Sequence, residues 1–175
     1  GTASVVLEDE NGDYNPQNVS GPYYGKLLPL RKIRIWADYD DGSGVDRYYL
    51  YSGYITSFDN TFRLGNDEVS SVTLQCVDAF RLLQNVNITT VAGSSAGQTT
   101  GARIENLLDL ASFPVSQRLI DVGDTLVQAD PGTSRTLLAA CQNLEQTELG
   151  GFFTDVAGNA VFLSRETVSL KADQT

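Results

Sequence analysis

Two groups of acidic residues are the part of the sequence with the clearest chemical potential. Asp9, Asn11 and Asp13 stand at alternate positions, which suits oxygen ligands of Ca²⁺. An EF-hand loop also needs Gly at its sixth position and Glu at its twelfth, where this chain has Ser20. A second group crowds one loop: Asp38, Asp40, Asp41 and Asp46. Solvated turns in an acidic protein are the favoured interpretation of both groups, so we expect no metal site and no cofactor.

The residue types of the common catalytic sites are largely missing. The chain has no His, which excludes a Ser-His-Asp triad and most zinc sites. Cys76 and Cys141 lie in apolar contexts, and two thiolates cannot complete a four-Cys metal site. We predict that both are buried, reduced side chains. No Gly-rich phosphate loop is present and no pair of carboxylates stands out, so we expect that the protein is not an enzyme.

A third group of residues is aromatic. It comprises Tyr48, Tyr49, Tyr51 and Tyr54 in one β-prone stretch, with Tyr23 and Tyr24 in an earlier loop. Packing within a half-buried sheet is the first interpretation, and a subunit interface, where aromatic residues are enriched, is the second. The third is a sugar-binding platform beside the acidic residues 38–46. That would make the protein a carbohydrate-binding or adhesion module, which we keep as the alternative function.

A long loop from Glu8 to Leu30 organises the first part of the chain. Its Gly and Pro residues predict repeated turns between two strands. Its tyrosines are too apolar for a solvated loop, so the loop is either a lid over a sheet or a contact surface for a partner. The candidate subunit-interface and loop-motif residues are Tyr14, Pro16, Pro22, Tyr23, Tyr24 and Gly25.

Alternating apolar and polar residues predict strands before and after this loop. The expected strands cover residues 4–7, 33–38, 47–58 and 69–77. Gly53 predicts a bulge or the close approach of another backbone. Both faces of strand 47–58 are mixed and carry aromatic and aliphatic residues, so we expect this chain or a neighbouring subunit to cover them. Asp78 is expected to cap a short helix that holds Phe80, Leu82 and Leu83.

The pattern changes after a small, polar stretch that resembles a flexible linker. We predict a β-rich domain over 1–92, a linker over 93–101 and a small α+β domain over 102–175. The second domain is expected to contain a helix around 104–111, a short strand near 119–122, a helix over 137–144 that stops at Gly150, and a hairpin over 152–163. The fold class is therefore α+β, with a barrel- or sandwich-like antiparallel N-terminal domain and a small domain of two helices and a β-hairpin.

Charge and composition limit the partners. Twelve Lys and Arg against 22 Asp and Glu give a net charge of −10, which argues against electrostatic binding of nucleic acid. No stretch approaches the roughly 18 apolar residues of a transmembrane helix, and no signal peptide is visible. The sequence starts with Gly and lacks Met, so we expect a segment, or a processed or tagged chain.

Several motifs occur in an order that resembles the tail hub proteins of tailed bacteriophages, also called minor tail or baseplate hub proteins. The first is the loop motif, followed by a Pro-Tyr-Tyr-Gly patch and a basic strand. A Gly-Tyr-Ile strand, a Cys-x-Asp-Ala segment and a Gly-Gly-x-Phe hairpin come later, and the match slips in register at that hairpin. The residues that carry the resemblance are Asn11, Gly12, Asp13, Tyr14, Asn15, Pro16, Asn18, Pro22, Tyr23, Tyr24, Gly25, residues 31–35, residues 50–57, residues 72–83, Gly150, Gly151, Phe153, Asp155, Gly158 and Phe162.

The resemblance implies a structural virion component at the tail tip, assembled in the host cytoplasm. Such hubs self-associate in a ring, commonly a trimer, and contact the tail tube, the tape-measure protein and other tail-tip proteins. They join the tube to receptor-binding or puncturing parts and form part of the DNA channel. Genomic DNA would pass without specific binding, and we expect part of the acidic excess to face that channel and repel it.

Overall fold

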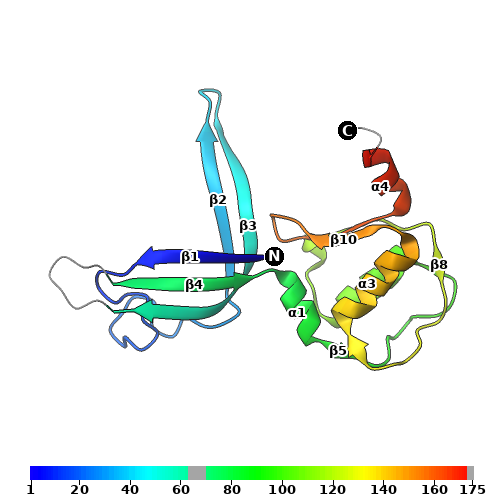
Figure 1. Ribbon diagram of the computed structural model, residues 1–175, viewed down its shortest axis with the longest axis horizontal. Coiled ribbons are helices and arrows are strands. Elements are labelled where there is room, and N and C mark those ends of the chain that lie inside the picture. The colour runs from blue at the N-terminus through cyan, green and yellow to red at the C-terminus, as the bar shows by residue number, and fades with distance from the viewer. Residues whose placement is uncertain (63–69, 173–175) are drawn as a thin grey trace. The chain divides into compact units, whose positions relative to one another are not determined.

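The computed structural model describes residues 1–62 and 70–172. The chain forms two compact units, Gly1–Asp78 and Ala79–Thr175 (Figure 1). The sequence-based boundary lay later, at a linker over 93–101. Those residues belong to the second unit, where Gln98–Thr99 pair with Leu126–Val127 as a short two-stranded ladder. The small polar residues that suggested a flexible linker instead form turns, including one at Gly97 with φ +86°.

The first unit is a curled, antiparallel sheet of four strands, which confirms the β-rich part of the predicted fold class. Its spatial order is β1 (Thr2–Glu8), β4 (Ser71–Val77), β3 (Val45–Thr61) and β2 (Lys32–Asp40). The predicted alternation in β4 is confirmed, because Val72, Leu74 and Cys76 are buried. Ile55 completes this core, and Phe58 and Tyr14 pack against it.

Strand β3 is long enough to serve two partners in succession. Tyr54 to Thr61 pair with β4, whereas Val45 to Tyr54 pair with β2. The register shifts twice, leaving Leu50 and Thr56 as extra residues. Gly53 is not the bulge, but the predicted close approach is confirmed: a Cβ there would lie 2.4 Å from the carbonyl oxygen of Val77.

The second unit packs helices around a three-stranded sheet, β10–β11–β7, in which β11 pairs antiparallel with β10 and parallel with β7. The two predicted helices, the short strand and the hairpin are all present. Two further helices complete the unit: α1, which was predicted but placed in the first domain, and α4, which was not predicted. The core of the unit contains Ile104, Leu108, Cys141 and Phe162. The elements are α1 (Ala79–Asn85), β5 (Asn87–Ile88), β6 (Gln98–Thr99), α2 (Thr100–Leu110), η1 (Val115–Gln117), β7 (Arg118–Ile120), β8 (Leu126–Val127), β9 (Arg135–Thr136), α3 (Leu137–Glu148), β10 (Gly151–Thr154), β11 (Ala160–Leu163) and α4 (Arg165–Ala172).

Local chemistry sets the ends of these helices. Thr99 and Thr136 cap α2 and α3, each accepting a hydrogen bond from the backbone N–H three residues later. Helix α3 ends at Glu148, and its C-cap residue Leu149 takes the left-handed conformation with φ 58°. The predicted stop at Gly150 is one residue late. Gly150 is needed for another reason, because a Cβ there would lie 2.2 Å from the carbonyl oxygen of Leu163.

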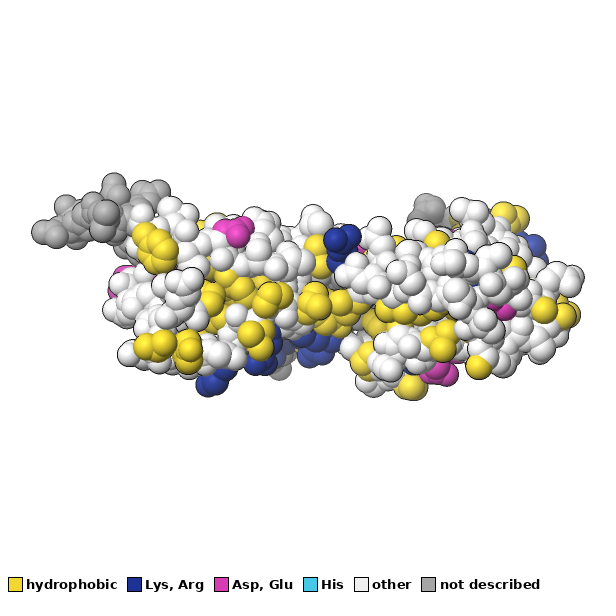
Figure 2. Space-filling model, turned by 90° about the horizontal axis from the view of Figure 1, so that it is seen from below, with side chains coloured by type: hydrophobic (Ala, Val, Ile, Leu, Met, Phe, Trp, Pro, Cys, Tyr) yellow, Lys and Arg dark blue, Asp and Glu magenta, His cyan; other side chains and the backbone are white. Residues whose placement is uncertain are grey.

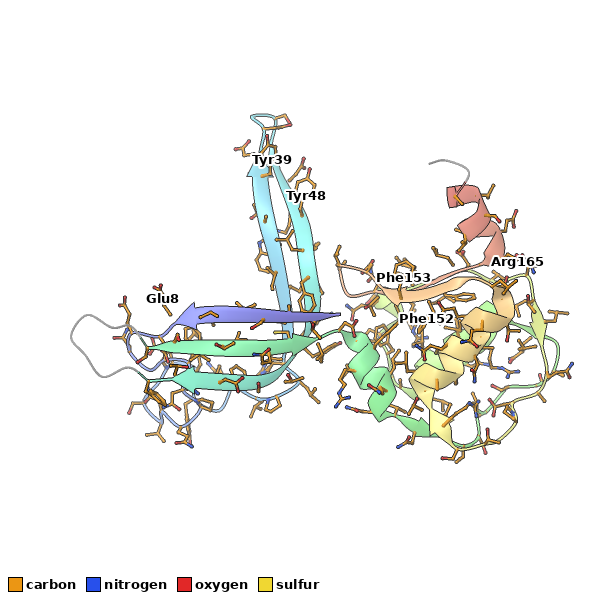
Figure 3. The ribbon with its side chains drawn as sticks, viewed as in Figure 1. Glu8, Tyr39, Tyr48, Phe152, Phe153 and Arg165 are labelled. Atoms are coloured by element: carbon orange, nitrogen blue, oxygen red, sulfur yellow. The ribbon has the colours of Figure 1, made fainter. Side chains whose placement is uncertain are left out.

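Alternation in β10 separates an interior residue from a surface residue. Phe152 is buried and stacks on Phe80 of α1 with ring centroids 5.3 Å apart, while Phe153 is exposed (Figure 3). Both cysteines are free and buried, as predicted. Among the described helices, none is long and apolar enough to cross a lipid bilayer.

Candidate functional site

The loop between β1 and β2 is ordered by its own hydrogen bonds. The backbone N–H groups of Asn15, Asn18, Gly21 and Tyr24 each donate to the carbonyl three residues earlier, which makes a chain of consecutive turns. The side chain of Asn18 donates to the carbonyl of Gly12 at 2.9 Å, tying the first turn to the third. The motif residues at the start of this loop therefore build a defined surface.

Tyr14 joins this loop to the sheet. Its backbone N–H donates to the buried Asp9 carboxylate, and its side chain packs against the core of the first unit. Burial, assisted by Tyr23 and nearby carboxylates, raises the pKa of Tyr14. Tyr23 stacks on Tyr14, and Tyr24 is 52% exposed. Tyr14 thus forms a lid, while Tyr23 and Tyr24 present aromatic surface to the solvent.

Beneath the loop lies an apolar pocket of about 380 Å³. Its floor is the sheet, through Leu7, Ile55, Phe58 and Leu74, and its walls are residues of the loop. Among the residues that the structure describes, two charged side chains line it, Lys26 and Arg31, and both are basic. Arg31 is held in place because its Nε donates to the carbonyl of Lys26 at 3.0 Å. Figure 2 views the molecule from the side of this loop and shows apolar side chains with Lys and Arg side chains beside them. The pocket suits an apolar group that carries negative charge.

Pro16, Pro22 and Gly25 shape the same loop. Gly25 adopts φ +71°, a conformation that glycine reaches without strain. Leu30, where the loop joins β2, also has a left-handed φ of 64°, and its N–H donates to the carbonyl of Ile55 at 2.6 Å. The structure therefore brings Tyr14 and Tyr23 together beside the pocket, whereas the role of Pro16, Pro22, Tyr24 and Gly25 in subunit contact stays a prediction.

A second candidate surface is the projecting end of the β2–β3 hairpin, which we call the arm (residues 36–50). Every residue of the arm is exposed. In the described part of the chain, this half of β3 pairs with β2 and with no other strand. The sequence predicted cover on both faces, but nothing in the described residues of this unit supplies it. Figure 1 shows the arm extending away from β1 and β4, and Tyr39 and Tyr48 lie toward its free end (Figure 3).

The register assigns the arm's side chains to two faces. Trp36, Asp38 and Arg47 share one face, on which the Arg47 guanidinium lies 4.8 Å above the Trp36 ring. Arg47 also forms two hydrogen bonds with Asp38, at 2.8 and 3.0 Å. These bonds lower the pKa of Asp38. The opposite face carries Tyr39 and Tyr48, which are 61% and 55% exposed, together with Asp46 directly across from Tyr39. The sequence did not single out Trp36 or Tyr39 as surface residues. Continuing the strand pairing of the hairpin into residues 38–46, which were expected to form an acidic loop, would have placed both residues on the arm.

The acidic groups do not form a metal site in this structure. Within residues 1–62 and 70–172, no three His, Cys, Asp or Glu side chains gather where a metal ion could be held. Asp40 and Asp41 accept hydrogen bonds from the N–H groups of Gly42 and Ser43 in the arm's turn. They therefore close the hairpin and leave a strongly acidic end.

Comparisons with known proteins give a likeness among solved structures and none among family models or curated sequences. No protein-family model matches the chain, and no curated protein matches its sequence. Among solved structures, the chain is similar to the crystal structure of a 43 kDa tail protein of prophage MuSo2 from Shewanella oneidensis, with a TM-score of 0.49 and 15% identity. The similarity covers 93% of this chain and 43% of that one, so the chain spans less than half of that protein's length. No functional conclusion follows from a similarity at this level.

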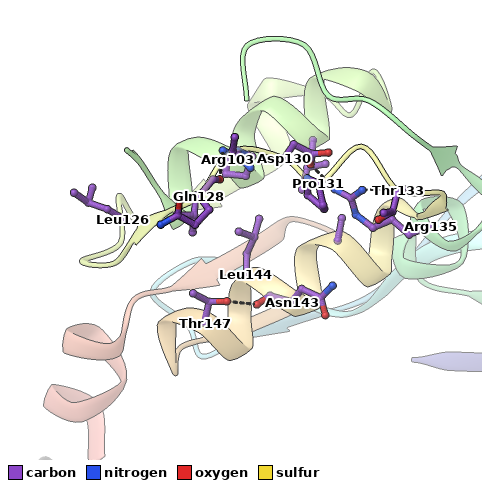
Figure 4. A pocket seen from close by; sticks show the side chains of 14 residues that line it. Arg103, Leu126, Gln128, Asp130, Pro131, Thr133, Arg135, Asn143, Leu144 and Thr147 are labelled. Carbon is purple, nitrogen blue, oxygen red and sulfur yellow. Dashed lines mark hydrogen bonds and ion pairs between the residues drawn. The ribbon is translucent and has the colours of Figure 1, made fainter. Parts of the chain in front are cut away.

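The second unit has a pocket of about 400 Å³ between α2, α3 and residues 126–135 (Figure 4). Arg103 lies at its edge and donates to the carbonyls of Ser95 and Gln128 and to the side chain of Gln98. Arg135 is paired with Asp130. Both cations are thus engaged in holding loops, and the pocket, which is lined by polar and apolar residues alike, is a feature of the fold.

Glu148 is the most deeply buried carboxylate of the second unit, and the sequence did not single it out. It accepts hydrogen bonds from the Thr100 hydroxyl at 2.8 Å and from the N–H groups of Asp124 and Thr125 at 3.0 Å. Burial opposes its ionisation, but these donors outweigh burial and hold the pKa of Glu148 at about 2. The side chain ties the end of α3 to the start of α2, which is a structural role.

Proposed function

We propose that this protein is a structural component of a bacteriophage tail and works by assembly rather than by catalysis. One observation carries the proposal: the exposed aromatic arm, built on a unit whose loop and strands hold the residues that resemble tail hub proteins. Large aromatic side chains without cover are characteristic of surfaces that are buried in an assembly. The motif residues Tyr14, Asn15 and Asn18 each form hydrogen bonds that order the loop, which supports treating the loop motif as a single structural element.

The finer proposal places the protein at the tail tip as a hub. It would self-associate in a ring, a trimer by the resemblance, and join the tail tube to receptor-binding or puncturing parts. A cyclic assembly repeats one heterologous contact around its axis, and each obligate contact buries on the order of 2,000 Å². The net charge of −10 suits a passage that DNA crosses without binding.

Immunogold electron microscopy tests this location. Antibodies against the purified chain would be applied to virions produced from the genome that encodes it. We expect label at the tail end distal to the head and peptides of this chain in purified tails. Virions that lack the chain, with the chain present in the infected cell, would overturn the proposal.

A carbohydrate-binding or adhesion module is the second candidate. Exposed aromatic rings next to Asp residues on the arm favour it. On one face, however, Arg47 already covers Trp36 and binds Asp38, the groups that a sugar would use. A glycan array separates the two proposals: specific glycan binding by a chain that is absent from tails would favour the module.

A further inference from the structure

The two unusual surfaces of the first unit are complementary in chemistry. The pocket beneath the loop is apolar, and the charged residues that line it in the described part of the chain are Lys26 and Arg31, both basic. The end of the arm, residues 38–47, has four Asp against one Arg, a formal charge of −3. On its open face Tyr39 and Tyr48 lie beside Asp46. The arm therefore presents an aromatic, acidic end, and the pocket accepts an apolar group with negative charge.

These surfaces cannot meet within one molecule. Lys32, at the base of β2, follows directly after the pocket residue Arg31, and Tyr39 lies seven residues further along a continuous strand. At about 3.3 Å per residue, Tyr39 is about 23 Å from Lys32. Figure 1 shows the end of the arm and the loop on opposite sides of the sheet. A paired strand cannot fold back over that distance, so the occupant of the pocket must come from another molecule.

We propose that the acidic end of the arm of one copy docks in the basic, apolar pocket of a second copy. Tyr39 and Tyr48 cover the pocket beside Tyr23 and Phe58, and Asp46 faces Lys26 and Arg31. This contact deepens the proposed self-association and rests on that proposed function. Because each copy carries both surfaces at separate places, the contact is heterologous and repeats head to tail, which a ring requires.

Charge reversal provides the first test. The pocket variant is Lys26→Glu with Arg31→Glu, and the arm variant is Asp41→Lys with Asp46→Lys. Sedimentation velocity should show self-association at least about tenfold weaker for either variant alone, since each then opposes like charges. An equimolar mixture should regain association, because the acidic pocket of one variant accepts the basic arm of the other. The control variant, Asp124→Lys with Glu166→Lys, changes exposed charges in the second unit and should associate as wild type does.

Cross-linking locates the contact even if it is weak. Ser43→Cys places a thiol at the turn of the arm and Lys26→Cys places one at the pocket, while the native cysteines Cys76 and Cys141 are buried. With a bifunctional maleimide, mixed S43C and K26C should form a cross-linked dimer several-fold faster than either variant alone. A mixture of S43C with Ser116→Cys, an exposed site in the second unit, serves as the control. Raising the salt concentration should slow the specific reaction.

Each outcome of the charge-reversal and cross-linking experiments either supports or contradicts the docking. Faster S43C–K26C cross-linking together with restored association in the charge mixture supports the docking. Equal rates for all pairs, or folded charge variants that associate as wild type does, overturn it. A wild-type chain that is monomeric at its highest soluble concentration and gives no preferred cross-link also overturns it. Immunogold label at the tail with no preferred cross-link would remove the docking and leave the tail function; the docking without tail label would remove the tail function alone.

Discussion

Tyr14 and Tyr23 stack with ring centroids 5.3 Å apart and planes inclined by 11°. Tyr14 packs on the sheet and is fixed by Asp9, so the stack transfers the rigidity of the sheet to the loop. Tyr23 and its neighbour Tyr24 are presented at a defined place as a consequence. Preorganised aromatic residues of this kind lose little conformational entropy when a partner covers them.

The Pro-Tyr-Tyr-Gly patch can be tested by single alanine substitutions. Tyr23→Ala removes the stack and should lower the free energy of unfolding by about 1 kcal/mol. Tyr24→Ala removes an exposed ring and should change that free energy by less than about 0.5 kcal/mol. Urea denaturation measures both. If Tyr24 contacts a partner, the Y24A chain should fold with normal stability but be incorporated into tails less efficiently than wild type. A Y24A chain that folds and enters tails normally would show that the patch is only part of a lid.

The arm gives a second prediction. Tyr39→Ser combined with Tyr48→Ser removes exposed aromatic surface, so stability should change by less than about 0.5 kcal/mol per site. Self-association and incorporation into tails should fall, because the rings would be buried in the assembly. Val156→Ala is a control at an exposed apolar site of the second unit. If the double variant associates as wild type does, the face of the arm that carries Tyr39 and Tyr48 does not mediate self-association.

The sequence predicted the regular parts of the fold because their side chains repeat with the period of their element. Val72, Leu74 and Cys76 alternate in β4, and Leu107, Leu108 and Cys141 lie on helical faces. It could not predict where a strand loses its cover. The apolar residues on both faces of β3 suggested a buried strand, but the register places the first half of β3 beyond β4, where it is exposed.

Long-range contacts explain the other differences. Residues 93–101 resemble a linker in composition, yet Gln98 and Thr99 are paired by β8, which is distant in sequence. Helix α4 was missed because its apolar pattern is weak. At the candidate site, the loop's tyrosines were found from composition, whereas the pocket beneath them required the positions of Leu7, Phe58 and Arg31 from three separate elements.

Gly101 tests whether the predicted linker is rigid. A Cβ at Gly101 would lie 1.9 Å from the carbonyl oxygen of Asp121, and a shift of the 121–125 loop would disturb the Glu148 cluster. Gly101→Ala should therefore lower the free energy of unfolding by about 2 kcal/mol or more. Gly151→Ala is the matched control in the same unit, since nothing lies within 4 Å of its added Cβ. Equal melting temperatures for the two variants would indicate that residues 93–101 shift to accommodate the added Cβ, as a flexible linker would.

The lowered pKa of Glu148 predicts how the free energy of unfolding depends on pH. Its folded pKa of about 2 lies below the ordinary 4.5, so the folded state favours the ionised carboxylate. This contribution is complete above pH 4.5 and is lost as the pH falls toward 2. It amounts to at most about 3 kcal/mol, from about 1.4 kcal/mol per pKa unit.

Glu148→Gln isolates this contribution from those of other carboxylates, which titrate equally in both proteins. At pH 7 the variant should be less stable by about 2 to 3 kcal/mol, because an amide cannot accept all the hydrogen bonds of Thr100, Asp124 and Thr125. Between pH 4.5 and 2 the difference from wild type should narrow as the wild-type carboxylate takes up its proton. Urea denaturation at pH 7, 4.5 and 3 measures it, with Glu166→Gln as an exposed control. A difference that stays constant over this range would mean that the charge of Glu148 does not stabilise the fold.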